Sequence, residues 1–140
     1  MTSGDPMSSR ASVEVVSRVL GKVLVEGRLN RIPRHPEHRD IVLAILCLGM
    51  RRRYPYAETE FNKYLEGALI ELRARVDHVT CRRYLVDFGF VKRDRAGTRY
   101  YLNGPKLESS LSNEAIASAR DLIRKALADR RKSSRGRRCA

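Results

Sequence analysis

The stretch that most constrains the fold is residues 77–102, DHVTCRRYLVDFGFVKRDRAGTRYYL. Asp77 is a residue type that commonly caps the start of a helix, and Gly89 is one that commonly ends it, because glycine adopts a positive φ at little cost. Between them, apolar side chains recur at spacings of four and three, which is typical of the buried face of a helix. This predicted core stripe is Cys81, Leu85 and Phe88. The first half of the stretch therefore predicts a short amphipathic helix.

The second half of the stretch predicts a basic β-hairpin. Residues 90–93 and 98–102 read as two strands, and residues 94–97 (DRAG) form a turn with glycine where a positive φ is needed. Four cationic side chains lie in this hairpin: Lys92, Arg93, Arg95 and Arg99. A helix that leads into such a hairpin is typical of the winged-helix form of helix-turn-helix domains.

The helix of residues 77–88 is expected to present arginine to its surroundings. A rotation of about 100° per residue from Cys81 brings Arg83 nearly opposite the core stripe. Val79 and Thr80 then flank Arg83, and Arg82 lies at the border of the exposed face. Arg83 is thus the side chain of this helix that is best oriented to contact a partner.

The segments before this stretch predict the remaining parts of a winged helix. Pro36 opens a helix over residues 36–48, with Ile41, Ala44, Ile45 and Leu48 as its inward stripe. Residues 54–56 (Tyr-Pro-Tyr) predict a short edge strand, because proline cannot donate to a sheet. A second amphipathic helix is expected over residues 57–72, weakened in its middle by glycine. The order helix, strand, helix, helix, hairpin predicts an α+β, winged-helix-like fold.

Helical extensions are expected on both sides of this domain. Ser12 caps a helix that ends near Gly27, and residues 28–36 form a connector. After a linker at residues 104–111, Ser112 caps a last helix with a narrow apolar seam, suited to docking on the domain or to pairing with a second copy. The chain is accordingly divided into residues 1–26, 27–104 and 105–140. Residues 1–11 are polar and predicted to be frayed, and the basic, serine-rich tail after Ala128 is predicted to be disordered.

The charge of the chain favours a nucleic-acid partner. Twenty-nine Lys and Arg residues oppose sixteen Asp and Glu residues, which gives a net charge of +13 over 140 residues. Such an excess is expected of a protein that contacts phosphates. No apolar run is long enough to cross a membrane, and the N-terminus lacks the apolar core of a signal peptide. We therefore expect a cytoplasmic protein without a membrane partner.

No cofactor, metal site or catalytic site is predicted. The three cysteines have no zinc-ligand or disulfide spacing, and we expect them to be reduced thiols. His78 and Cys81 lie one helical turn apart and, together with His35 and His38, raise the question of a metal, but Cys81 falls on the core stripe. The carboxylates form no paired acid site, and no glycine loop cradles phosphates. We do not expect an enzyme.

Several motifs resemble the prokaryotic Domain of Unknown Function 2087 family. They are GRLNRIP, the apolar helix HRDIVLAIL, and the pattern YAE followed by EFN. A last motif consists of Asp77, the run CRRYLVDFGFVKR and, after the turn, RYY; the motifs together cover Gly27 to Leu102. The resemblance implies a small winged-helix-like domain that occurs alone or fused to helix-turn-helix regulators, with no known reaction. It includes a set of polar positions: Glu58, Glu60, Asn62, Asp77, Arg82, Arg83, Asp87 and Arg93. Two departures are Ala57 in place of a Ser/Thr cap and a longer segment between Asn62 and Asp77.

The candidate nucleic-acid-binding residues fall into two groups. Arg82, Arg83 and Thr80 are candidates for contacts with base edges, since arginine can bind guanine bidentately in the major groove. The candidates for phosphate contacts are Lys92, Arg93, Arg95, Arg99, Arg51, Arg52 and Arg53. The alternatives are ion pairs of Arg83 with Asp87 and of Arg82 with Asp77, and a solvated basic surface.

The expected function is nucleic-acid binding, with DNA preferred over RNA and a role in transcription regulation. Two alternatives stay open. One is a protein-interaction module that forms a homodimer through the terminal helices, and the other is an RNA- or ribosome-associated protein that uses its basic tail.

Overall fold

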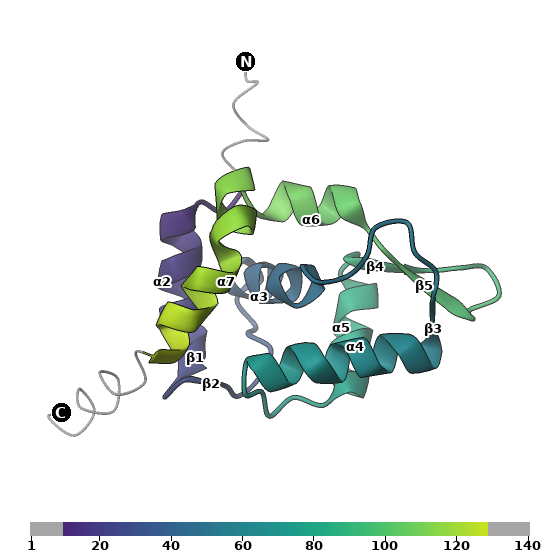
Figure 1. The fold of residues 1–140 in the computed structure, drawn as a ribbon, viewed down its shortest axis with the longest axis horizontal. Coiled ribbons are helices and arrows are strands. Elements are labelled where there is room, and N and C mark those ends of the chain that lie inside the picture. The colour runs from purple at the N-terminus through teal and green to yellow at the C-terminus, as the bar shows by residue number, and fades with distance from the viewer. Residues whose placement is uncertain (1–9, 129–140) are drawn as a thin grey trace, which may run out of the picture.

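The computed structural model describes residues 10–128, which form six helices and five strands, and one of these helices, α3 (Pro36–Cys47), lies at the centre. Every residue from Ile41 to Cys47 is buried. A helix that is apolar on all sides must be covered on all sides. Helices α2 (Val13–Val23), α4 (Glu58–Glu71) and α6 (Gly104–Ser110) pack against it, and Figure 1 shows α3 in the middle of the molecule.

The two terminal helices pack against each other. Helix α2 begins after Ser12, whose hydroxyl accepts a hydrogen bond from the Val15 N–H, and α7 (Asn113–Ala128) begins after Ser112, which accepts from the Ala115 N–H at 3.0 Å. Both caps are as the sequence predicts. Their buried side chains are Val16, Val19 and Leu20 of α2 and Ala115, Ala119 and Leu122 of α7. All six are buried hydrophobic residues, and all but Ala119 belong to one core cluster with the residues of α3.

The segment after α2 differs from the prediction. The helix ends at Val23 rather than near Gly27, and a small antiparallel hairpin follows, formed by β1 (Leu24–Val25) and β2 (Arg28–Leu29). Glu26 and Gly27 form its turn with φ values of 56° and 71°. Two consecutive positive φ angles are typical of the tight two-residue turn whose twist matches a hairpin. Strands of two residues are too short to produce an alternating pattern, so the hairpin was not predicted.

Two further predictions at the ends of the domain are wrong. Ala11 is not frayed: its N–H donates to the Ser110 carbonyl at 2.9 Å, and it forms a parallel bridge with Leu111. The rest of that prediction, for residues 1–9, lies outside the described residues. The expected linker contains α6, whose first turn is capped by the Asn103 side chain. Only Leu107 of this helix is buried. A single apolar residue gives no helical stripe, so the sequence pattern did not indicate this helix.

The three-stranded sheet has the order β3–β5–β4 and is antiparallel throughout. It comprises β3 (Tyr56–Ala57), β4 (Val91–Arg93) and β5 (Arg99–Leu102). Strand β3 lies at an edge as predicted, but it covers residues 56–57 rather than 54–56. Tyr100 and Leu102 are buried. Because side chains alternate along a strand, Arg99 and Tyr101 lie on the other face, together with Lys92, which is paired with Tyr101. Gly97 in the β4–β5 turn has a φ of 73°, as the turn sequence predicts.

Helix α4 begins at Glu58 although alanine precedes it. Ala57 has no side-chain acceptor, so only one half of a capping box forms: the Glu60 carboxylate accepts from the Ala57 N–H at 2.9 Å. The Tyr54 hydroxyl donates to the second Glu60 oxygen at 2.7 Å. These two hydrogen bonds hold the pKa of Glu60 below its ordinary value. Glu60 thus fixes the start of α4, and the helix continues past Gly67 to Glu71.

The fold is α+β, and the predicted order of helix, strand, helix, helix and hairpin is observed from α3 to β5. Within residues 10–128, every helix is either too short or too polar to cross a lipid bilayer.

Candidate nucleic-acid interface

Helix α5 (His78–Asp87) is fixed by its cap and by its buried face. The Asp77 carboxylate accepts a hydrogen bond from the Thr80 N–H at 2.8 Å, and this bond lowers the pKa of Asp77. Cys81 and Leu85 are fully buried, while Phe88, the third predicted core residue, is half-buried and stacks with Tyr84.

Burial removes Cys81 from chemistry at the surface. It raises the pKa of the Cys81 thiol to about 12, so the sulfur stays protonated and is neither a nucleophile nor a metal ligand at neutral pH. The neighbouring His78 has a different partner, since its Nδ1 lies 3.4 Å from a carboxylate oxygen of Glu66. The geometry therefore does not join His78 and Cys81 in one site.

Arg82 connects three elements of the domain. Its Nη1 donates to the Asn62 side-chain oxygen at 2.8 Å and lies 3.7 Å from a Glu58 oxygen. Its guanidinium also lies 5.9 Å from the centre of the Tyr100 ring. Only 22% of the Arg82 side chain is exposed. The candidate base contact at Arg82 is thus occupied by contacts that hold α5 against α4 and β5.

Arg83 differs from Arg82 in every one of these respects. It is exposed, and no hydrogen bond, ion pair or ring contact involves its side chain within residues 10–128. The alternative ion pairs, Arg83 with Asp87 and Arg82 with Asp77, are both absent from that range. Thr80 is exposed beside it, and Val79 is 45% exposed. The exposed face of α5 therefore combines a cation, a hydroxyl and an apolar side chain.

Substitutions of Arg82 and Arg83 are expected to differ in their effect on the stability of the fold. We expect Arg82→Ala to lower the free energy of unfolding by about 1–2 kcal/mol, because a charged hydrogen bond is lost while the partly exposed Glu58 pair adds little. Arg83→Ala should change it by less than about 0.5 kcal/mol. Urea unfolding followed by circular dichroism measures both values, and equal midpoints for the two variants would contradict the structural role of Arg82.

The four cations of the hairpin differ in the contacts that their side chains make. Lys92 and Arg95 are exposed and have no partner within the described part of the chain. Arg93 lies with its guanidinium 5.5 Å from the Tyr100 ring centre and donates to the Gly97 carbonyl at 3.4 Å. Arg99 donates to the Thr98 carbonyl at 3.3 Å. These two are exposed as well, so all four can reach an anion in solution.

The Arg51–Arg53 run lies next to the sheet. Arg53 is exposed with a φ of 58°, and Arg51 lies over the Tyr54 ring at 4.7 Å. Arg52 forms an ion pair with Glu108 at 2.8 Å, and about half of each side chain is exposed. A hollow of about 670 Å³ is lined by Arg52, Arg53 and Tyr101, together with Leu102, Gly104, Pro105 and Glu108.

This hollow adds a residue that sequence reasoning did not assign to the interface. That residue is Tyr101, one of two adjacent tyrosines in β5. It lies on the outer face of β5 beside the arginine run, whereas Tyr100 is buried. Along β5, Tyr100 and Leu102 are buried, whereas Tyr101 is half-buried and Arg99 is exposed, and this period of two is the signal that distinguishes the two tyrosines.

Comparisons with known proteins identify a family but no characterised relative. No curated protein and no solved structure matches the chain. A family model described as "Uncharacterized protein conserved in bacteria (DUF2087)" matches residues 28–102, which is just over half of the 140-residue chain and includes α3, the three-stranded sheet and α5. The chain therefore belongs to the DUF2087 family.

Proposed function

We propose that the protein binds duplex DNA through a winged-helix arrangement and acts in transcription regulation in the cytoplasm. In this proposal α5 enters the major groove, and the β4–β5 hairpin is the wing. The element order from α3 to β5 and the sheet order β3–β5–β4 support the arrangement. The net charge of +13 supports a polyanionic partner. The proposal includes no chemical reaction.

The observation that carries the proposal is the contrast between Arg82 and Arg83. Arg83 is exposed and has no partner among residues 10–128, so it retains its capacity to donate hydrogen bonds, while Arg82 holds the helix in place. Arg83 can donate two parallel hydrogen bonds to a guanine, and the Val79 methyl groups suit the methyl group of thymine. The Thr80 hydroxyl interacts with the Asp77 carboxylate, and its oxygen can still accept a hydrogen bond from a base. The exposed face of α5 thus has the chemistry that base edges require.

The remaining cations supply affinity without sequence information. Lys92, Arg95 and Arg53 are exposed, and no partner engages them within residues 10–128. Arg52 can exchange Glu108 for a phosphate at small cost, because ion pairs that are half exposed contribute little to stability. Phosphate contacts of this kind orient a protein on the duplex.

The test separates base reading from charge. Duplexes are first selected from a random pool with the wild-type protein, and affinities are then measured by fluorescence anisotropy for a selected and a scrambled duplex. Arg83→Ala should weaken binding to the selected duplex by about 5- to 150-fold, which corresponds to about 1–3 kcal/mol. The matched control is Arg120→Ala, which removes an exposed α7 arginine without a partner in the described residues. Both variants should bind the scrambled duplex alike.

Two outcomes would contradict the proposal. One is a selection that enriches no sequence, and the other is equal affinity of the Arg83→Ala and Arg120→Ala variants for the selected duplex. Single-stranded DNA and RNA of the same length are measured in parallel. A preference for RNA would favour the alternative of an RNA-associated basic protein.

A protein-interaction module is the second candidate function. It is favoured by Ile70, which is 74% exposed on α4, and by a hollow of about 560 Å³ between α3, α4 and α7. Against a dimer through the terminal helices, the α7 side chains Ala115, Ala119 and Leu122 are buried within the chain. Sedimentation at two salt concentrations distinguishes the candidates, since the interaction module should give a salt-insensitive dimer that does not bind nucleic acid.

A further inference from the structure

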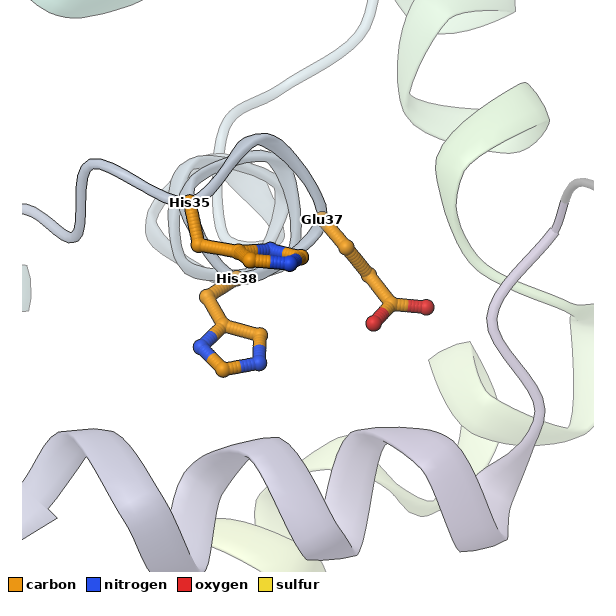
Figure 2. A group of neighbouring side chains, drawn as sticks. All are labelled: His35, Glu37 and His38. Carbon is orange, nitrogen blue, oxygen red and sulfur yellow. The ribbon is translucent and has the colours of Figure 1, made fainter.

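Three metal-ligating side chains that the proposed interface does not use meet at the start of α3. His35, Glu37 and His38 each offer one donor atom, and these atoms all lie within 4.8 Å of one another. Figure 2 shows the three side chains on the same side of the first turn of α3. Two imidazoles and one carboxylate form a donor set that suits late transition metals.

The backbone explains why three residues so close in sequence converge. His35 is the N-cap residue and has an extended conformation, with φ −61° and ψ 124°, and Pro36 occupies the first helical turn. His35 therefore reaches the helix from outside, while His38 lies within the first turn. The two rings lie 4.4 Å apart at 32°. The His35 side chain makes no capping hydrogen bond. Glu37 forms no ion pair within residues 10–128, so the donor atoms are available.

We propose that His35, Glu37 and His38 bind a divalent late transition-metal ion such as Zn²⁺, with water completing the coordination. In a tetrahedral site with bonds of about 2.0–2.1 Å, donor atoms lie about 3.3 Å apart. His35 and Glu37 are exposed, so rotation of their side chains can close the remaining distance. Sequence reasoning considered His35 and His38 but omitted Glu37. The signal that it missed is the sequence His-Pro-Glu-His at a helix start.

The charges around His38 limit the affinity. Lys22 and Arg18 lie close enough to His38 to act on it electrostatically, and the carboxylate of Glu37 acts on it in the opposite sense. Lys22 and Arg18 belong to α2, which lies beside the three side chains in Figure 2. These cations and the positive end of the α3 dipole oppose a bound cation. The site should therefore be weaker than a structural zinc site, and removal of a cation from α2 should strengthen it.

The direct test is a Zn²⁺ titration against a chromogenic chelator, with tag-free protein that carries Cys139→Ser. Cys47 and Cys81 do not compete, because they are buried and burial raises the pKa of both thiols. Wild type should bind one Zn²⁺, and His35→Ala and His38→Ala should each weaken binding at least about tenfold, since each removes one of three ligands. His78→Ala removes a histidine elsewhere and should match wild type within about twofold.

A charge-reversal variant tests the same site without removing a ligand. Lys22→Glu should strengthen Zn²⁺ binding, and this gain should disappear in Lys22→Glu/His35→Ala. Since His35 is exposed and Lys22 is exposed, both variants should remain folded, which circular dichroism checks. Equal affinity of wild type and His35→Ala, or no change with Lys22→Glu, would overturn the proposal.

Discussion

The affinity for duplex DNA is expected to fall by roughly 10³- to 10⁵-fold when monovalent salt rises from about 50 to 200 mM. The reason is counterion release: about 6–10 phosphate contacts give a slope of about −0.9 per contact in a plot of log K against log salt. The described cations that are proposed to contact phosphates are Lys92, Arg93, Arg95, Arg99, Arg51, Arg52 and Arg53. Fluorescence anisotropy at five or more salt concentrations measures the slope.

A truncation after Ala128 shows how much of this slope comes from the tail. The tail carries six Arg and Lys residues, at positions 130, 131, 132, 135, 137 and 138, and lies outside the described residues. The truncated chain should bind more weakly and with a smaller slope, yet it should keep its preference for the selected duplex. If the truncation abolishes binding while Arg83→Ala has no effect, the groove model for α5 is wrong and the tail is the binding element.

Phe61→Ala is expected to lower the free energy of unfolding by about 3–5 kcal/mol. Phe61 of α4 is fully buried, and its ring centre lies 4.9 Å from that of Tyr100 and 6.2 Å from that of Tyr56. One side chain thus joins α4 to both β3 and β5. Its removal leaves a cavity between the helix and the sheet, in addition to the lost transfer free energy. Urea unfolding gives the value from the midpoint and slope.

The control for this variant lies on the same helix. Ile70 is 74% exposed, so Ile70→Ala should change the free energy of unfolding by less than about 0.5 kcal/mol. A similar small effect of Phe61→Ala would mean that the sheet is not held by this ring. The near-ultraviolet circular dichroism of the tyrosines adds a local readout, because the ring beside Tyr56 and Tyr100 is removed.

The elements predicted from sequence are those in which apolar residues recur at the regular spacing of a helix or a strand. Helix α5 and the β4–β5 hairpin were predicted to within a residue or two, because the core stripe, the Asp77 cap and the glycines at positions 89 and 97 all indicated the same structure. The β1–β2 hairpin and α6 were missed, since two-residue strands and a helix with one buried side chain carry no period. Local patterns therefore predict an element only where several of its residues face the core.

The partners of Arg82 illustrate what a single sequence cannot provide. Sequence reasoning weighed Asp77 as the partner of Arg82, and Asp87 as the partner of Arg83, because these residues are close along the chain. The side chain that accepts its hydrogen bond, Asn62, is 20 residues away and belongs to another helix. The resemblance to the family had included Glu58, Asn62 and Arg82 among its polar positions, without indicating that they touch. Tertiary contacts decided which of two adjacent arginines is structural.

The burial of α3 on every side has a practical consequence for the experiments above. The family match ends at Leu102, whereas α3 also packs against α2 and α6, which lie outside residues 28–102. A fragment trimmed to the match would expose the apolar surfaces of Ile41 to Cys47 that these two helices cover, and aggregation would mask any effect of a surface substitution. The smallest piece suitable for measurement is therefore the full span from Arg10 to Ala128, in which Ala11 forms a bridge with Leu111 and α2 packs against α7.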